Sequence, residues 1–129
     1  MSVWDLVTEY LDTLLPEKWD AMDLYERRNF LSDRGDPTRP KGSVRRMQVS
    51  NPEIWAECFG RNPADMKAAD SYAISAIMLQ LEGWEKSWER KRIPFYGQQR
   101  LYLRKEGFRP VLTDAYSDRT EKAEPEFLD

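Results

Sequence analysis

The residues with the clearest chemical potential lie between positions 84 and 105, where cationic and aromatic side chains alternate. This segment holds seven Lys or Arg side chains against two Glu, a net charge of +5 in a chain whose net charge is −3. A local positive field attracts polyanions whatever the sign of the whole protein. Aromatic rings between the cations are suited to stacking on bases, so the segment predicts contact with nucleic acid.

The candidate binding residues combine these side chains with polar and basic neighbours. They are Arg45, Arg46, Ser75, Lys86, Trp88, Arg90, Lys91, Arg92, Tyr96, Gln98, Arg100, Tyr102 and Arg104. Structural alternatives stay open for several of them: Trp88 and Tyr96 suit packing as well as stacking, and Arg45–Arg46 suits the surface of a strand. The whole basic run also fits a solvated hairpin. Trp55 and Trp84 border apolar helix faces, which favours core positions.

Missing residue types exclude most catalytic schemes. The chain has no histidine, which removes Ser-His-Asp and Cys-His nucleophiles and histidine general bases. Its one cysteine, Cys58, forms no internal disulfide and, without histidine, no zinc site. There is no P-loop motif, and no pair of carboxylates has a spacing that indicates acid–base chemistry. We therefore expect a non-enzymatic protein without a cofactor or metal.

The composition is that of one ordinary domain. A chain of 129 residues with 40% hydrophobic and 33% charged side chains can bury one core. The lone cysteine fits a reducing compartment, and no apolar run approaches the ~20 residues that span a bilayer. The N-terminus lacks the basic flank and apolar stretch of a signal peptide. We expect a cytoplasmic protein without membrane contact.

Three helical pieces are predicted upstream of the basic segment, after a short strand over residues 44–50. Asn51-Pro52-Glu53 places a capping residue, a proline and an acid in the order that begins a helix, and Asn62-Pro63 repeats this start. The apolar side chains over 71–81 follow the i, i+3, i+4, i+7 spacing of an α-helix, which Asp70 is expected to cap.

The basic segment itself predicts a β-hairpin. Pro94 and Gly97 mark its turn, and in Arg100–Arg104 the leucines alternate with arginine and tyrosine, the period of a half-buried strand. Helices followed by a basic hairpin are the layout of a winged helix-turn-helix, whose second helix enters the major groove. The outward face of helix 71–81 is poor in Arg, Lys and Asn. We therefore expect backbone contact by the hairpin and little sequence specificity.

The first 32 residues predict a pair of helices. Apolar side chains between Val3 and Leu15 form a wide helical stripe behind a Ser2 cap, and Pro16 ends it. A second helix is expected within residues 19–32. So wide a stripe packs on its own domain or docks on a partner.

The predicted fold is mainly α with a small β-hairpin, a winged helix-turn-helix preceded by an N-terminal helical pair. Residues 1–32 form the N-terminal helical extension. Residues 33–43, with glycines and prolines and no apolar side chain, read as a linker. The winged helix-like domain occupies 44–105, and residues 106–129 are predicted to be an acidic, flexible tail.

Several runs of residues, taken in order, carry a family likeness. They are Tyr10–Asp12, Leu15–Trp19, Tyr25–Leu31, Val44–Arg46, Glu53–Glu57, Gly83-Trp84 and Tyr96–Arg104, within about residues 5–105. They resemble the C-terminal region of the virulence-associated protein E family, the primase-helicase-like replication proteins of phages and mobile genetic elements. The first two runs resemble the segment that closes the ATPase module of that family. The family's ATP-binding loop and acidic partner motif lie upstream of this region and are absent here.

The resemblance implies an accessory domain without its motor, in the cytoplasm of a bacterial host cell, and lends it no ATPase or helicase activity. The expected function is non-catalytic nucleic-acid binding, to DNA rather than RNA, in phage or mobile-element replication. The alternative is a protein-interaction module. It would dock on a replicative ATPase, a primase or a host protein through residues 1–32, or be a phage-encoded inhibitor of a host or defence protein.

Overall fold

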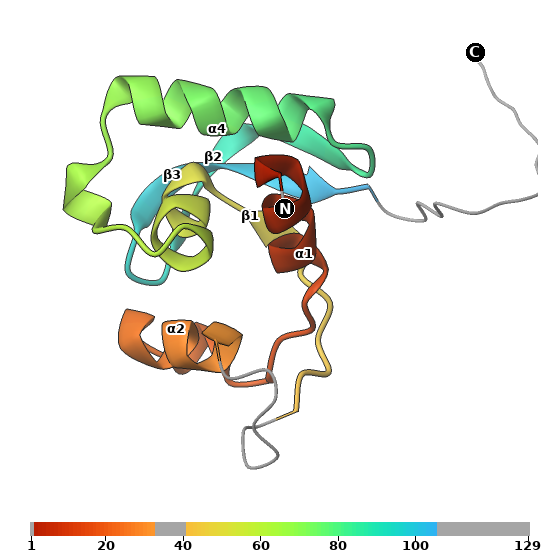
Figure 1. Ribbon diagram of the computed structural model, residues 1–129, viewed down its shortest axis with the longest axis vertical. Coiled ribbons are helices and arrows are strands. Elements are labelled where there is room, and N and C mark those ends of the chain that lie inside the picture. Colours follow the sequence, from red (N-terminus) through yellow and green to blue (C-terminus); the bar gives the residue numbers. More distant parts are fainter. Residues whose placement is uncertain (1, 33–40, 106–129) are drawn as a thin grey trace, which may run out of the picture.

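The computed structural model describes residues 2–32 and 41–105, which combine helices with a small antiparallel sheet (Figure 1). The predicted tail and residues 33–40 of the predicted linker lie outside the described residues. The helical elements are α1 (Val3–Asp12), a 3-10 turn (Trp19–Ala21), α2 (Leu24–Ser32), α3 (Asn51–Glu53), a π-helical turn (Ile54–Cys58), a second 3-10 turn (Pro63–Asp65) and α4 (Ala68–Gln80). The strands are β1 (Gln48–Val49), β2 (Trp84–Ile93) and β3 (Gly97–Arg104).

Short polar side chains begin the helices, largely where the sequence predicts. The Ser2 hydroxyl accepts a hydrogen bond from the Asp5 N–H at 3.2 Å, and the Asn62 side chain accepts one from the Ala64 N–H at 2.9 Å. At α4 the prediction is off by one turn. The helix begins at Ala68, and the Asp70 carboxylate, inside its first turn, accepts from the Lys67 N–H at 2.9 Å.

The sheet has three strands in the order β1-β3-β2, so the predicted hairpin gains a third strand. The strand expected over residues 44–50 is shorter than predicted, because Val44 pairs with Leu15 in an isolated bridge and only Gln48–Val49 joins β3. In β2 the register shifts between Lys86 and Arg90, and three residues there lie opposite one residue of β3. Such a bulge bends its strand and re-aims side chains.

The hairpin turn lies at Pro94–Tyr96, as predicted. Gly97 follows with a φ of 76°, in the left-handed region that favours glycine. Phe95 also has a positive φ, 69°, and its ring lies 5.2 Å from the Arg27 guanidinium of α2. The contact between this ring and the cation holds the tip of the hairpin against the second helix.

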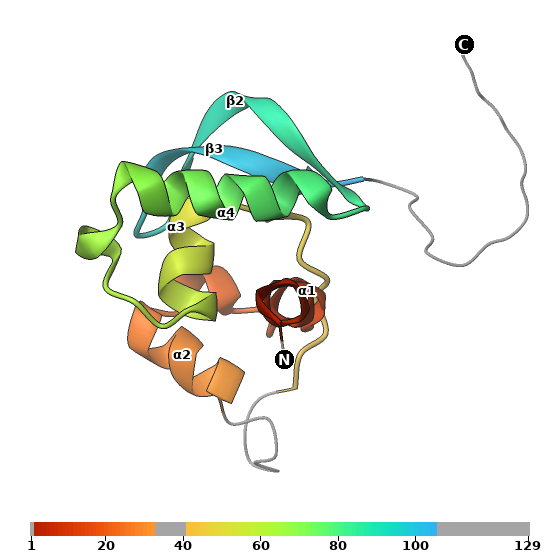
Figure 2. The same cartoon turned by 45° about the horizontal axis from the view of Figure 1, so that its top comes forward.

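One hydrophobic core joins α1, the π-helical turn, α4 and the sheet (Figures 1 and 2). Its buried members are Val7, Tyr10, Leu11, Val49, Ile54, Ile74, Ile77, Met78, Trp84 and Tyr102. The apolar stripe of α1 therefore packs mostly against its own domain, although Val3 and Trp4 stay exposed. Helix α4 runs along the sheet, and α2 lies at the far side of the molecule from it, as both views show.

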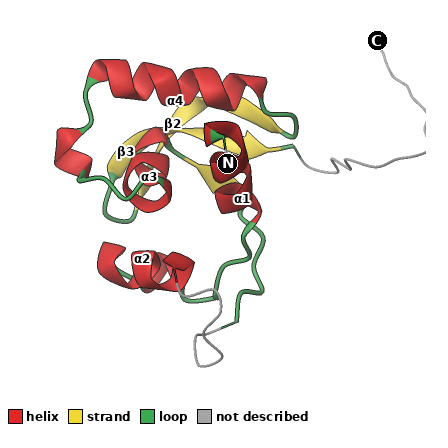
Figure 3. Ribbon diagram, in the orientation of Figure 1, coloured by secondary structure: helices red, strands yellow, loops and turns green. Residues whose placement is uncertain are grey.

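A smaller apolar cluster joins the 3-10 turn to α2. It contains Leu15, Trp19, Met22 and Phe30, with the Trp19 and Phe30 rings edge to face at 5.9 Å. Figure 3 shows the helices and the loops that join them arranged around the small sheet. Within residues 2–32 and 41–105, no helix has the length and apolar character needed to cross a bilayer.

Candidate functional site

Six of the predicted binding residues share one face of the hairpin, because antiparallel strands place opposite residues on the same side of a sheet. They form the cross-strand pairs Lys86–Tyr102, Arg90–Arg100 and Arg92–Gln98. Val49 of β1 pairs with Tyr102 and lies on the same face, which carries the core at its inner end. The face therefore changes along the hairpin from apolar packing near β1 to cationic and amide side chains near the turn.

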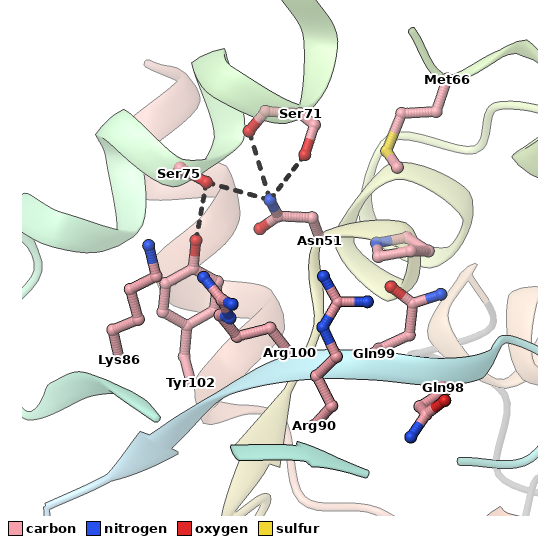
Figure 4. A pocket seen from close by; sticks show the side chains of 11 residues that line it. Asn51, Met66, Ser71, Ser75, Lys86, Arg90, Gln98, Gln99, Arg100 and Tyr102 are labelled. Atoms are coloured by element: carbon pink, nitrogen blue, oxygen red, sulfur yellow. Dashed lines mark hydrogen bonds between the residues drawn. The ribbon is translucent and has the colours of Figure 1, made fainter. Parts of the chain in front are cut away.

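A groove of about 260 Å³ lies between this face and the helices α3 and α4 (Figure 4). One wall carries the amide and hydroxyl groups of Asn51, Ser71 and Ser75. The opposite wall is the sheet, which presents its cations and amides. These sheet residues are Lys86, Arg90, Gln98, Gln99, Arg100 and Tyr102. The groove is thus lined from both sides by groups that bind anions or form hydrogen bonds.

A hydrogen-bond network fixes the helical wall. The Asn51 side-chain nitrogen donates to the Ser71 hydroxyl at 2.9 Å and to the Ser75 hydroxyl at 3.0 Å. The Tyr102 hydroxyl donates to the Ser75 hydroxyl at 2.8 Å, so a strand residue closes the network from the other wall (Figure 4). Ser75 and Tyr102, both predicted from the sequence, therefore meet through one oxygen.

The cations of the groove have no compensating carboxylate in the described part of the chain. Lys86, Arg90 and Arg100 are exposed, and no ion pair joins any of them to an acid of residues 2–32 or 41–105. Arg90 and Arg100 are also direct cross-strand partners. Like charges placed opposite each other destabilise a strand pair, and an anion bound between them would remove that cost.

The exposed members of the predicted set that lie outside the groove are spread over the hairpin and one distant edge. Lys91 is exposed and does not line the groove, and Arg92 pairs with Gln98 near the turn. Trp88 lies in the bulge with 83% of its surface exposed. Arg45 is exposed in the segment before β1, where it lines a separate cavity with Trp84.

Tyr102 has its ring in the core, and three further predicted residues also use their side chains inside the protein. Arg46 is 4% exposed, with its guanidinium 4.4 Å from the centre of the Tyr10 ring. Arg104 donates from Nε to the Arg46 carbonyl at 2.7 Å, stacks 4.6 Å above Trp84, and burial lowers its pKa. The Tyr96 hydroxyl donates to Glu57 at 2.9 Å, and burial raises the pKa of this phenol. The side chains of these three residues are therefore engaged within the protein.

Sequence reasoning missed Asn51, which it interprets only as the start of a helix. Its partners in the groove lie 20 and 24 positions away in α4, so no local pattern predicts them. Pro52 and Met66 also line the groove without a sequence signal. The lining offers cations, amides and hydroxyls, which are groups that bind anions and form hydrogen bonds.

Comparison with known proteins adds no relative. No protein-family model matches the chain, and no curated protein has a significantly similar sequence. The resemblance to the virulence-associated protein E family therefore stays a prediction.

Proposed function

We propose that this protein is a non-catalytic nucleic-acid-binding accessory domain that holds phosphates in the groove between α4 and the β2–β3 hairpin. The observation that carries the proposal is the directly opposed pair of Arg90 and Arg100, exposed beside Lys86 and without an ion pair to any acid of residues 2–32 or 41–105. A guanidinium group can donate two parallel hydrogen bonds to the oxygens of one phosphate. The hydroxyls and the amide of the facing wall add neutral hydrogen bonds.

The hairpin, not the long helix, is the proposed contact with the backbone. The only charged side chain within α4 is Asp70, so this helix offers phosphates no cation. Its exposed side chains include Tyr72 and Leu79, which do not form the bidentate contacts that distinguish bases. In a winged helix with these side chains, the β2–β3 hairpin provides most of the affinity for nucleic acid, and the sequence specificity is low.

The sequence resemblance supplies the context of the proposal. From it we propose a role in phage or mobile-element replication in the bacterial cytoplasm, with DNA as the preferred ligand and a replicative ATPase or primase as partner. No ATPase activity is proposed. The alternative function, a protein-interaction module, is favoured by large exposed apolar side chains, Trp4 on α1 and Tyr72 and Leu79 on α4.

Binding measured by fluorescence anisotropy tests the proposal. With labelled oligonucleotides we expect affinity to fall steeply with salt, because each phosphate contact releases counterions. The variant Arg90→Ala/Arg100→Ala should weaken binding at low salt by about tenfold or more and lower the slope of log K against log salt by about 2.

The matched control is Lys18→Ala/Lys41→Ala, which removes the same charge from two exposed positions outside the groove. We expect it to bind almost as the parent does. Equal losses of affinity in the two double variants would mean that the positive field of the whole protein attracts the oligonucleotide and that the groove is not a specific site. Absence of binding at low salt would contradict the proposal and favour the protein-interaction module.

A further inference from the structure

The groove has two walls, and this limits the shape of the ligand. Ser71 and Ser75 face Arg90 and Arg100 across it, and its volume of about 260 Å³ is near the lower end for small-ligand pockets (Figure 4). A space of this kind accepts a narrow chain or a nucleotide-sized group. A duplex presents its phosphates on the outside of a wide rod, which contacts ridges and surfaces and does not enter between two walls.

Trp88 gives the second observation. Its indole is 83% exposed, lies in the bulge of β2, and is two positions from Lys86 on one side and from Arg90 on the other. Aromatic side chains beside backbone-binding cations are the usual platforms for unpaired bases. The bases of a duplex already stack on each other, so an exposed indole has a stacking partner only where a base is unpaired.

From these two features we infer that the groove takes single-stranded nucleic acid, with phosphates against Lys86, Arg90 and Arg100 and one base stacked on Trp88. This inference rests on the proposed function and names its ligand class. The bulge is what permits it, because three residues of β2 facing one residue of β3 leave the indole free of the regular strand ladder.

The test compares single strands with a duplex in one anisotropy series at constant low salt. The probes are labelled oligo-dT of about 12 nucleotides, the same length of oligo-U, and a mixed-sequence duplex of that length. We expect at least one single strand to bind about tenfold more tightly than the duplex. Equal or tighter binding of the duplex would overturn the inference and leave the proposed function standing. Failure of all three probes would overturn both.

Variants of Trp88 test the stacking contact. Trp88→Ala should weaken single-strand binding by about fivefold or more, whereas Trp88→Phe, which keeps an aromatic face, should stay within about threefold of the parent. Tyr72→Ala is the matched control, since Tyr72 is 77% exposed on α4 and does not line the groove. Unchanged single-strand binding of Trp88→Ala would overturn the stacking contact, as would equal losses in Trp88→Ala and Tyr72→Ala.

Discussion

Two glutamates in the segment 51–58 differ in how the protein compensates their charge. Glu57 accepts hydrogen bonds from Arg27, Tyr10 and Tyr96 at 2.7–2.9 Å. Glu53 accepts hydrogen bonds from the Ser50 N–H and hydroxyl, but its nearest cationic atom is Nη1 of Arg46, at 3.7 Å. Burial and the neighbouring charge of Glu57 raise the pKa of Glu53 to about 7.

This raised pKa predicts a pH-dependent stability difference. Because the folded pKa of Glu53 exceeds its ordinary value of 4.5, the stability that this group contributes is complete below pH 4.5 and is lost as the pH rises through about 7. Glu53→Gln cannot ionise and keeps an acceptor for Ser50. We expect its unfolding free energy in urea to rise relative to the parent protein between about pH 5 and about pH 8, by on the order of 1–3 kcal/mol. A constant difference between the two proteins across that range would contradict the prediction.

At the level of single residues the sequence predicts the burial of Trp84 well, and the exposure of Tyr102 and of several arginines poorly. Trp84 is buried in the core, as its apolar neighbours indicate. Arg46 and Arg104 are also buried, although the alternation of their segments predicts surface positions. Arg104 is held by the Leu11 carbonyl and Asp12, more than ninety positions earlier in the chain, and a local pattern carries no information about such partners.

The hairpin is the element that the sequence predicts best. Its turn residues act locally, so proline and glycine place the turn where it lies. The bulge in β2 and the third strand are not predictable in the same way. The charged run over 85–92 has no apolar alternation from which a change of register could be inferred, and β1 contributes only two residues.

The opposed arginines of this hairpin are predicted to lower the stability of the fold by a measurable amount. Arg90→Gln removes one of two like charges that face each other, so we expect it to raise the unfolding temperature at low salt, equivalent to about 0.2–1 kcal/mol, and to lose this advantage at about 1 M salt. Arg92→Gln is the matched control, since Arg92 faces the neutral Gln98. Differential scanning fluorimetry of both variants measures the effect, and equal shifts in the two would argue against repulsion between Arg90 and Arg100.

For the whole molecule, Glu57 joins segments that are distant in the sequence. Its side chain is fully buried and contacts Tyr10 of α1, Arg27 of α2 and Tyr96 of the hairpin tip. Arg27 is itself 2% exposed and also donates to the Trp19 carbonyl. The carboxylate therefore joins elements of both apolar clusters, which Leu31 of α2 also contacts.

Removing this charge should destabilise the entire described fold. Glu57→Gln leaves the Arg27 guanidinium buried without its counter-ion, and we expect a loss of about 3–5 kcal/mol in unfolding free energy. Urea unfolding followed by tryptophan fluorescence and by far-ultraviolet circular dichroism should give coincident single transitions. Glu82→Gln, an exposed position, is the control. A loss below about 1 kcal/mol, or a separate transition for α2, would contradict this role of Glu57.

The composition of residues 33–43 predicts a break between two parts of the chain. The structure shows that the residues before and after this segment nevertheless pack together. Leu15 and Val44, on either side of the segment, exchange two backbone hydrogen bonds of 2.8 Å. Helix α1 contributes Val7, Tyr10 and Leu11 to the core that α4 and the sheet complete. A run of Gly and Pro indicates where regular structure stops, but it says nothing about which surfaces meet afterwards.

The position of β2 has a consequence for how the protein behaves in concentrated solution. It is an edge strand, so among the described residues one side of its ten-residue backbone has no strand partner. Six of those ten residues are charged and the bulge interrupts the ladder, two devices that keep edge strands from pairing with other copies. Two of the cations proposed to hold phosphates, Lys86 and Arg90, lie on this edge strand, so we expect that neutralising them, by mutation or by a bound polyanion, favours self-association through sheet extension.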